Sequence, residues 1–224
     1  MDCLVLTNST LFSGMPEDDV NELLRKTPHQ IMRYGKEETV FHMMDNADRI
    51  GILLGGRVEA QKSFPNGSQV NVSIRGPGEL IGHAAAFSSG HRFPCDIVAL
   101  EPVTVMMVKK EHLLVLLQKD VRILENFITE ISSTTYMLQQ RLELLSYKGI
   151  AQKAAFWLLM EARRTSSQKV CIPDSVSRWA MLMNVSRPSL HRELKHLADQ
   201  RIITYSPPII EIRNRNALQD VLSQ

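Results

Sequence analysis

Residues 172–197 read IPDSVSRWAMLMNVSRPSLHRELKHL, and this stretch decides the fold of the C-terminal part of the chain. Asn184 tolerates the left-handed backbone of a tight turn, Ser186 is a favourable helix N-cap, and Pro188 suits the first turn of a helix, where its missing N–H has no partner to lose. Three leucines give the second helix one apolar face: Leu190, Leu194 and Leu197. The stretch therefore predicts a helix, a tight turn and a second helix with a polar outer face.

The polar face of the second helix carries side chains that could read DNA. A recognition helix presents its N-terminal residues to base edges, and arginine is the commonest specific reader because its fork pairs with guanine O6 and N7. We expect Arg187 and Arg192 to contact bases; contact with phosphates alone, or pairing of Arg192 with acidic side chains, is the alternative. The DNA-binding candidates are Arg178, Ser186, Arg187, Ser189, His191, Arg192 and Lys195. Residues 202–212 then predict two short strands about Pro207-Pro208, which would form a wing.

Charge is distributed unevenly along the chain, although the net charge is only +2. Residues 1–149 carry 15 Lys and Arg against 18 Asp and Glu, whereas residues 150–224 carry 11 against 6. A small basic domain on an acidic body favours a partner with a phosphate backbone. The excess of basic residues could also be ordinary solvated surface charge. The charge distribution therefore supports the DNA-binding prediction but does not establish it.

A regular apolar seam occupies the centre of the sequence, where residues 103–148 contain neither Gly nor Pro. From about Glu111 apolar residues fall at alternating steps of four and three, which predicts a long helix that forms a parallel homodimer. The seam positions are Leu117, Val121, Leu124, Ile128, Ile131, Thr135, Leu138, Leu142 and Leu145. Those expected in the dimer interface are Leu124, Ile128, Ile131, Thr135, Leu138 and Leu142. Ile123 and Phe127 lie outside the seam, so one flank of the helix is expected to cover the N-terminal domain.

Short apolar runs alternate with turn residues ahead of this helix, and they predict β-hairpins. The runs are residues 39–41, 50–54 and 70–74, with turns expected at residues 55–56 and 65–67. Helices are expected over residues 16–26 and, after Gly149, over residues 150–164. The chain is therefore expected to have an α+β fold with a β-roll sensor domain at 1–110, a dimerisation helix at 111–148 and a winged helix-turn-helix domain at 149–224.

Three segments in this order resemble the CRP/FNR superfamily of bacterial transcription regulators: Gly78-Glu79-Leu80-Ile81-Gly82, Gly149-Ile150-Ala151-Gln152, and Val185 to Leu194. The resemblance covers essentially the whole chain. It implies an N-terminal double-stranded β-helix of the cyclic-nucleotide-binding type, a long dimerisation helix and a C-terminal winged helix-turn-helix. It also implies a homodimer that recruits RNA polymerase and binds palindromic double-stranded DNA, with its recognition helices in major grooves about 34–36 Å apart.

The resemblance further implies where an unknown small effector would bind. The expected pocket residues are Gly78, Glu79, Leu80, Arg92, Phe93, Pro94, Thr134 and Thr135. Members that bind cyclic nucleotides hold the phosphate with an Arg-Ser or Arg-Thr pair six residues before an alanine, and counting back from Ala99 gives Phe93-Pro94. We therefore do not expect cyclic AMP to bind. Arg92 lies one position too early, and Thr134-Thr135 match the positions that contact the base, so a displaced cyclic nucleotide site is the alternative.

Other cofactors have less support. Only Cys3 stands near the N-terminus, where the resemblance places the cysteine cluster of oxygen-sensing members, so no iron–sulfur cluster is expected. The alternatives are a small organic effector, oxidation of Cys95, no effector, or haem. A haem could take an axial ligand from His42, Met43, Met44, His83 or His91. No His-x-His pair, H-E-x-x-H, G-x-S-x-G or phosphate-binding loop is present, so we expect neither a metal site nor an enzyme.

The sequence also bears on location and on a rival function. No apolar run approaches the roughly 20 residues of a membrane-spanning helix, and the apolar residues 4–6 lack the basic flank of a signal peptide. We expect a cytoplasmic protein without a membrane partner. The rival function is a cyclic-nucleotide-like or haem-binding sensor module that acts on a protein partner, which would not need the helix-turn-helix.

Overall fold

The computed structural model describes residues 3–63, 69–173 and 175–223, and the chain divides into two compact units, Met1–Thr134 and Thr135–Gln224. The boundary falls inside the helix α5 (Val121–Ser146). The three domains expected from the sequence, with limits at residues 110 and 148, remain a prediction. The turn expected at residues 65–67 lies outside the described residues.

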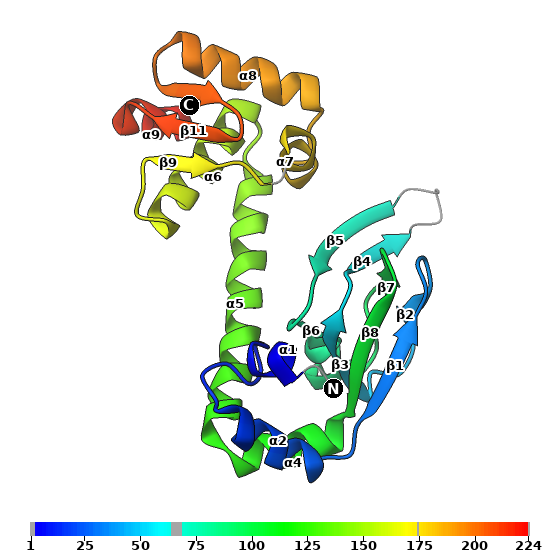
Figure 1. Cartoon of the computed structure of the whole chain (residues 1–224). Helices are drawn as coiled ribbons and strands as arrows, with labels where there is room; N and C mark the ends of the chain where they lie inside the picture. Colours follow the sequence, from blue (N-terminus) through cyan, green and yellow to red (C-terminus); the bar gives the residue numbers. More distant parts are fainter. Residues whose placement is uncertain (1–2, 64–68, 174, 224) are drawn as a thin grey trace. The chain divides into compact units, whose positions relative to one another are not determined.

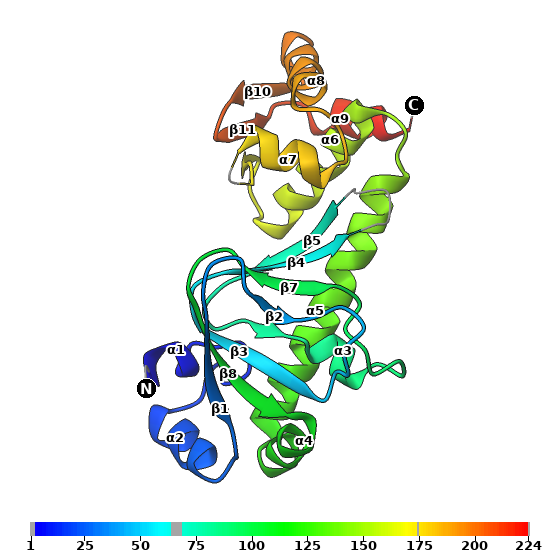
Figure 2. The same cartoon turned by 90° about the vertical axis from the view of Figure 1, so that its right-hand side faces the viewer.

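The first unit contains a β-roll of two four-stranded antiparallel sheets (Figure 1, Figure 2). One sheet has the strand order β1-β8-β3-β6 and the other β2-β7-β4-β5. The first sheet comprises β1 (Gln30–Tyr34), β8 (Val103–Lys109), β3 (Arg49–Gly55) and β6 (Leu80–Ile81). The second comprises β2 (Thr39–Phe41), β7 (Asp96–Ala99), β4 (Val58–Ser63) and β5 (Gln69–Arg75). The strands predicted at residues 39–41, 50–54 and 70–74 are thus confirmed.

The core of the roll lies where β3 pairs with β8. Ile50 and Ile52 of β3 are fully buried beside the apolar residues of β8. At Gly51 an added Cβ would lie 2.7 Å from Val105 Cγ1 and 2.8 Å from Ile81 Cγ1. Glycine is needed there because any side chain would push β3 away from the neighbouring strands.

Helices flank the roll within the first unit, and an interruption separates the last two of them. They are α1 (Cys3–Thr7), α2 (Glu17–Arg25), α3 (His83–Phe87), α4 (Lys110–Lys119) and α5. Asp120 has an extended backbone between α4 and α5, and its carboxylate accepts a hydrogen bond of 2.9 Å from Arg122 N. The helix expected from about Glu111 is therefore two helices. The seam position Leu117 is accordingly buried in the core of the first unit instead of being exposed.

The remaining seam positions on α5 are mostly exposed. Ile123 and Phe127 belong to the buried core, which confirms that one flank of the helix covers the N-terminal domain. Ile131 packs partly against the same core. The exposed seam residues are Val121, Leu124, Ile128, Thr135, Leu138, Leu142 and Leu145. Most of the predicted seam therefore lies at the surface of the single chain.

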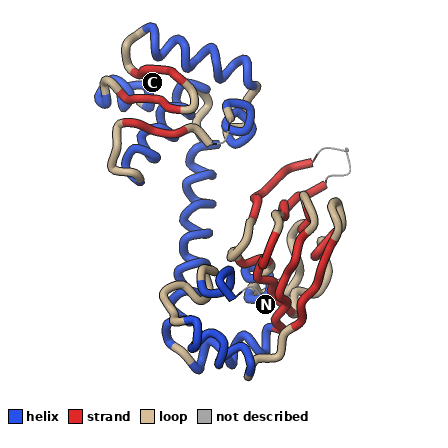
Figure 3. Tube along the Cα trace, in the orientation of Figure 1, coloured by secondary structure: helices blue, strands red, loops and turns tan. Residues whose placement is uncertain are grey.

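The second unit packs helices against a small sheet (Figure 3). Its sheet has the order β10-β11-β9. Its elements after α5 are α6 (Ile150–Arg164), β9 (Lys169–Cys171), α7 (Val176–Leu182), α8 (Arg187–Asp199), β10 (Ile203–Ser206), β11 (Ile209–Ile212) and α9 (Arg215–Leu222). Trp157 of α6 and Trp179 of α7 meet in the core, with ring centroids 4.7 Å apart.

The helix-turn-helix predicted from the sequence forms between α7 and α8. Asn184 has a φ of 53°, the left-handed conformation expected for the turn. Ser186 Oγ accepts a hydrogen bond of 3.2 Å from Ser189 N, which caps α8. The two strands about Pro207-Pro208 also form, as β10 and β11. Among the described residues no helix combines the length and the apolar character needed to cross a membrane.

Candidate effector site and nucleic-acid interface

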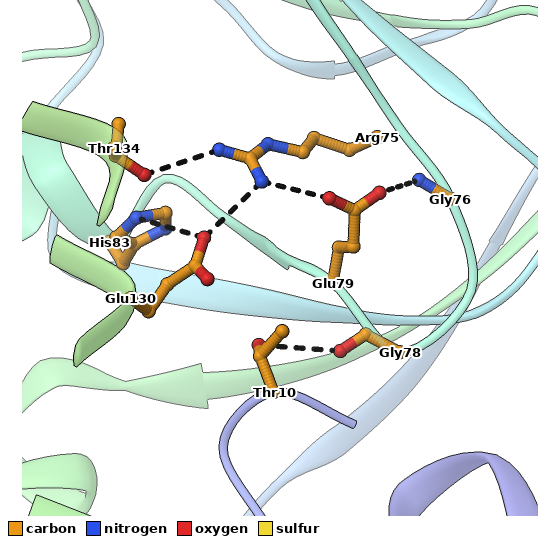
Figure 4. Close-up of polar contacts among 8 residues, drawn as sticks. All are labelled: Thr10, Arg75, Gly76, Gly78, Glu79, His83, Glu130 and Thr134. Atoms are coloured by element: carbon orange, nitrogen blue, oxygen red, sulfur yellow. Dashed lines mark hydrogen bonds and ion pairs between the residues drawn. The ribbon is translucent and has the colours of Figure 1, made fainter. Parts of the chain in front are cut away.

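A polar cluster in the first unit gathers around Arg75, the last residue of β5 (Figure 4). Arg75 Nη1 donates to Glu79 Oε1 at 2.8 Å and to Glu130 Oε1 at 3.2 Å. Arg75 Nη2 donates to Thr134 Oγ1 at 3.4 Å. Glu79 is oriented in turn, because its Oε2 accepts a hydrogen bond of 2.6 Å from Gly76 N. Arg75 therefore ties the strand end and the following turn to α5.

The charges of this cluster are largely satisfied internally. The side chain of Glu130 is 11% exposed and that of Arg75 is 18% exposed, so solvent screens the pair only weakly. The carboxylates of Glu79 and Glu130 both accept from the Arg75 guanidinium, and the Thr134 hydroxyl accepts from a further N–H of the same group. An anion approaching Arg75 would have to displace Glu79 or Glu130, and it would meet the repulsion of the other carboxylate.

His83, at the start of α3, is the buried neighbour of the cluster. Its Nε2 lies 4.0 Å from Glu130 Oε1, and neither ring nitrogen has a hydrogen-bond partner among the described residues. Burial, followed by the positive charge of Arg75, lowers the pKa of His83 to about 4. The imidazole is consequently neutral at pH 7. Its ring packs edge-on against Phe127 of α5, with centroids 6.4 Å apart.

The structure brings only some of the predicted pocket residues to this cluster. Glu79 and Thr134 belong to it, whereas Arg92 is exposed and donates to the Met44 carbonyl oxygen at 2.6 Å. Phe93 is buried and stacks on Phe41, with ring centroids 4.3 Å apart. The other candidates lie as follows: Gly78 accepts a hydrogen bond from Thr10 N at 2.9 Å, Leu80 is buried in β6, and Pro94 and Thr135 are exposed.

Sequence reasoning missed Arg75, Glu130 and the role of His83 beside them. The available signal was local: Arg75 precedes Glu79 by four residues across a turn that contains Gly76 and Gly78. Glu130 carries no such signal, since it lies 55 residues from Arg75 in the sequence. The described residues contain no group of three or more His, Cys, Asp or Glu side chains arranged to hold a metal ion.

The cysteines also bear on the effector. Cys95 is buried, and burial raises the pKa of its thiol, with Asp96 acting in the same direction. A buried thiol with a raised pKa forms less thiolate, the species that is oxidised. This weighs against oxidation of Cys95 as the signal. Cys171, at the end of β9, is exposed.

The second candidate site is the outer face of α8. Leu190 and Leu194 are fully buried, so the opposite face of the helix points away from the core of the second unit. Three cationic side chains are exposed there and make no ion pair or hydrogen bond with any other described residue: Arg187, Arg192 and Lys195. Unpaired cations on a capped helix are suited to a polyanionic partner.

The other predicted DNA-binding residues have contacts within the second unit. Ser186 Oγ donates to Ser189 Oγ at 2.8 Å, so both hydroxyls take part in the helix cap. Arg178 N donates to Ser175 Oγ at 3.2 Å at the start of α7. His191 is exposed, but its Nδ1 lies 3.0 Å from Tyr205 Oη on β10. The contact between His191 and Tyr205 could not be predicted from the sequence, because it depends on how β10 packs against α8.

Each of the two structural units contains a match to a known protein family. Residues 31–120 match the cyclic nucleotide-binding domain family, and residues 152–221 match the Crp-like helix-turn-helix domain family. The chain belongs to the CRP/FNR superfamily. The combination of a β-roll, a long helix and a helix-turn-helix, expected from the sequence, is confirmed for this CRP/FNR chain.

Curated and solved relatives of this CRP/FNR chain align with nearly its whole length. It is 23% identical to the cyclic AMP receptor protein of Thermus thermophilus over 216 residues, 96% of this chain and 98% of that protein. The structure of a CooA variant from Carboxydothermus hydrogenoformans is similar, with a TM-score of 0.67, 14% identity and coverage of 98% of this chain and 95% of the other. The Thermus thermophilus catabolite activator protein gives a TM-score of 0.55 at 22% identity and coverages of 96% and 99%. At these identities the structural likenesses establish the fold alone.

Proposed function

We propose that this CRP/FNR chain is a homodimeric transcription regulator that binds palindromic DNA through α8 and recruits RNA polymerase. In this proposal the β-roll senses an effector and α5 transmits the signal to the helix-turn-helix. The observation that carries the proposal is the row of exposed cations Arg187, Arg192 and Lys195 on α8, none of which is paired with another described residue. Side chains of this kind are available for bases and phosphates without first breaking a contact inside the protein.

The apolar seam of α5 supports the homodimer. Leu142 is 71% exposed and Ile128 is 53% exposed, although both are large apolar side chains. Their spacing in steps of four and three is that of a coiled-coil interface. A second copy of the same helix, related by a twofold axis, would cover the seam with an identical apolar face.

We further propose that the effector is not cyclic AMP. Phe93 and Pro94 stand where cyclic-nucleotide-binding members carry the phosphate pair, and Phe93 is buried against Phe41. Arg75, the cation of the candidate site, has Glu79 and Glu130 as counter-ions. A calorimetric titration of the purified protein with cyclic AMP is expected to give no saturable heat. Saturable binding would contradict this assignment and would favour a displaced phosphate site.

The DNA-binding role is tested by selecting duplexes from a random pool and measuring affinity for the selected operator by fluorescence anisotropy. Arg187→Ala is expected to weaken binding by about 1–3 kcal/mol and to relax base preference at one position in each half-site. Arg163→Ala, at the exposed end of α6, is the matched control and should change neither. If the wild-type protein selects no duplex, the rival function, a sensor module acting on a protein partner, is favoured. Unchanged affinity and specificity in Arg187→Ala would refute the base contact.

A further inference from the structure

A polar side-chain pair, His191 of α8 and Tyr205 of β10, links the second helix of the helix-turn-helix to the wing. His191 Nδ1 lies 3.0 Å from Tyr205 Oη, and the two rings are 5.4 Å apart between centroids. β10 runs beside α8 in the second unit (Figure 2). The hydrogen bond occupies one ring nitrogen and fixes the plane of the imidazole. It leaves Nε2 of this exposed side chain available to another partner.

The chemistry of imidazole determines what that partner could be. A neutral ring has one N–H donor and one acceptor nitrogen, whereas a protonated ring has two donors. In the protonated form Nδ1–H donates to Tyr205 Oη, and Nε2–H can donate to an anionic oxygen with the added strength of a charged hydrogen bond. Tyr205 suits this arrangement because its hydroxyl can accept from His191 and still donate its own proton.

The charged side chains around His191 are mostly cations, so the anion that would stabilise a protonated imidazole has to come from a binding partner. Along α8, Arg187 and Lys195 lie one helical turn to either side of His191. Beyond Tyr205, a surface pocket is lined by Arg201 and Arg213 as well as by the tyrosine. Arg213 is paired there with Glu211 of β11, whose Oε2 lies 3.1 Å from Arg213 Nη2. No carboxylate among the described residues forms an ion pair or hydrogen bond with His191, from α6, α7 or β10. A phosphate oxygen placed beside Nε2 would favour the protonated ring.

Burial raises the pKa of Tyr205, and the positive charge of Arg187 acts in the opposite direction. The phenol therefore keeps its proton at neutral pH, and Tyr205 stays an uncharged partner of the imidazole. A change in the charge of the pair must then come from His191.

We propose that His191, oriented by Tyr205, contacts a DNA phosphate and takes up one proton from solvent when the DNA binds. The phosphate oxygen accepts from Nε2–H, Nδ1–H donates to Tyr205 Oη, and no bond other than the new N–H is formed. His191 is the phosphate-contacting residue and Tyr205 is its positioning residue. The proposal rests on the DNA-binding function proposed above and adds a protonation step to it.

The test uses the full-length protein and a fluorescein-labelled duplex of mixed sequence at low ionic strength, where phosphate contacts dominate affinity. Wild-type affinity is expected to fall about tenfold between about pH 6 and pH 8, beyond the change seen in His191→Gln, which cannot titrate. His196→Gln is the matched control, because His196 lies on the same helix and contacts Gln200 instead of the wing. It should keep the wild-type pH profile. Calorimetry in two buffers of different ionisation enthalpy should report proton uptake in the wild type and not in His191→Gln.

Two further measurements separate the proposed roles. At pH 6, His191→Gln should lower the slope of log affinity against log salt by about one, as loss of a single phosphate contact requires. Tyr205→Phe should flatten the pH profile, whereas a purely structural tyrosine would lower affinity equally at every pH. The proposal is overturned if His191→Gln keeps the pH dependence, or if the dependence occurs only with a selected operator, which would indicate a base contact. A wild-type protein that binds no duplex at any pH would refute the DNA-binding function itself, and this inference with it.

Discussion

The substitution Leu138→Glu tests whether the exposed seam of α5 is a dimer interface. Leu138 is 45% exposed in the single chain, and a dimer would cover that exposed part. Complete burial of a leucine side chain contributes roughly 1.5–3 kcal/mol, so the exposed fraction corresponds to about 1 kcal/mol in each copy and about 2 kcal/mol in each dimer. This alone weakens association about 30-fold. The two introduced carboxylates, facing each other across the interface, would add to the loss.

Sedimentation velocity over a dilution series measures this effect directly. The wild-type protein is expected to sediment as a dimer, and Leu138→Glu should shift towards the monomer at concentrations where the wild type remains associated. Thr129→Glu is the matched control, since Thr129 is exposed on α5 and lies nine residues away, about half a turn round the helix from Leu138. A Leu138→Glu protein that is as dimeric as the wild type would refute the assignment of this face.

Two further predictions concern the cluster around Arg75. Glu130→Gln should lower the free energy of unfolding by about 1 kcal/mol in urea denaturation at pH 7, because the amide oxygen can still accept from Arg75 but no longer carries a charge. Glu125→Gln, exposed on α5, should change nothing, and equal stabilities of all three proteins would contradict the ion pair. His83 should make folding pH-dependent: with its pKa lowered from 6.5 to about 4, the unfolded chain takes up the proton first, so stability is lost progressively as pH falls from 6.5 to about 4. The loss should amount to at most about 3 kcal/mol and be reduced in His83→Phe. An unchanged pH profile in that variant would show that folding does not lower the pKa of His83.

Local chemistry explains why the helix-turn-helix could be predicted. Asn184 adopts the left-handed backbone of the turn, and Ser186 caps a backbone N–H three residues ahead of it. Both effects involve only neighbouring residues, and both occur in the structure. The apolar spacing of Leu190 and Leu194 belongs to a single helix as well. Neither feature depends on how distant segments pack.

The seam on α5 was predicted only in part, because periodicity does not state which apolar face meets which partner. Leu117 and Leu124 belong to the same apolar repeat in the sequence. The helix is nevertheless interrupted at Asp120, and Leu117 packs into the core of the first unit. The break depends on Asp120 accepting hydrogen bonds from Arg122, which is a contact that apolar spacing does not reveal.

The candidate effector site was predicted least well. The family resemblance predicted Arg92 and Phe93 as pocket residues. In the structure Arg92 donates to the Met44 carbonyl oxygen, and Phe93 stacks on Phe41 in the core. The cation of the cluster is Arg75, whose partners Glu130 and Thr134 come from α5. A contact across 55 residues depends on docking of the strand end against the helix, so no local pattern encodes it.

Sequence alone therefore determined the features whose causes are short-range, namely the capped helix α8, its apolar face and the strands at residues 39–41, 50–54 and 70–74. Tertiary structure decided the partners of individual polar groups: Arg75 with Glu130, and His191 with Tyr205. The physical reason is that hydrogen bonds and ion pairs require distances near 3 Å, which only packing of separate elements can set. Periodicity and capping act within a turn or two of the same helix and can be read directly from the order of residues.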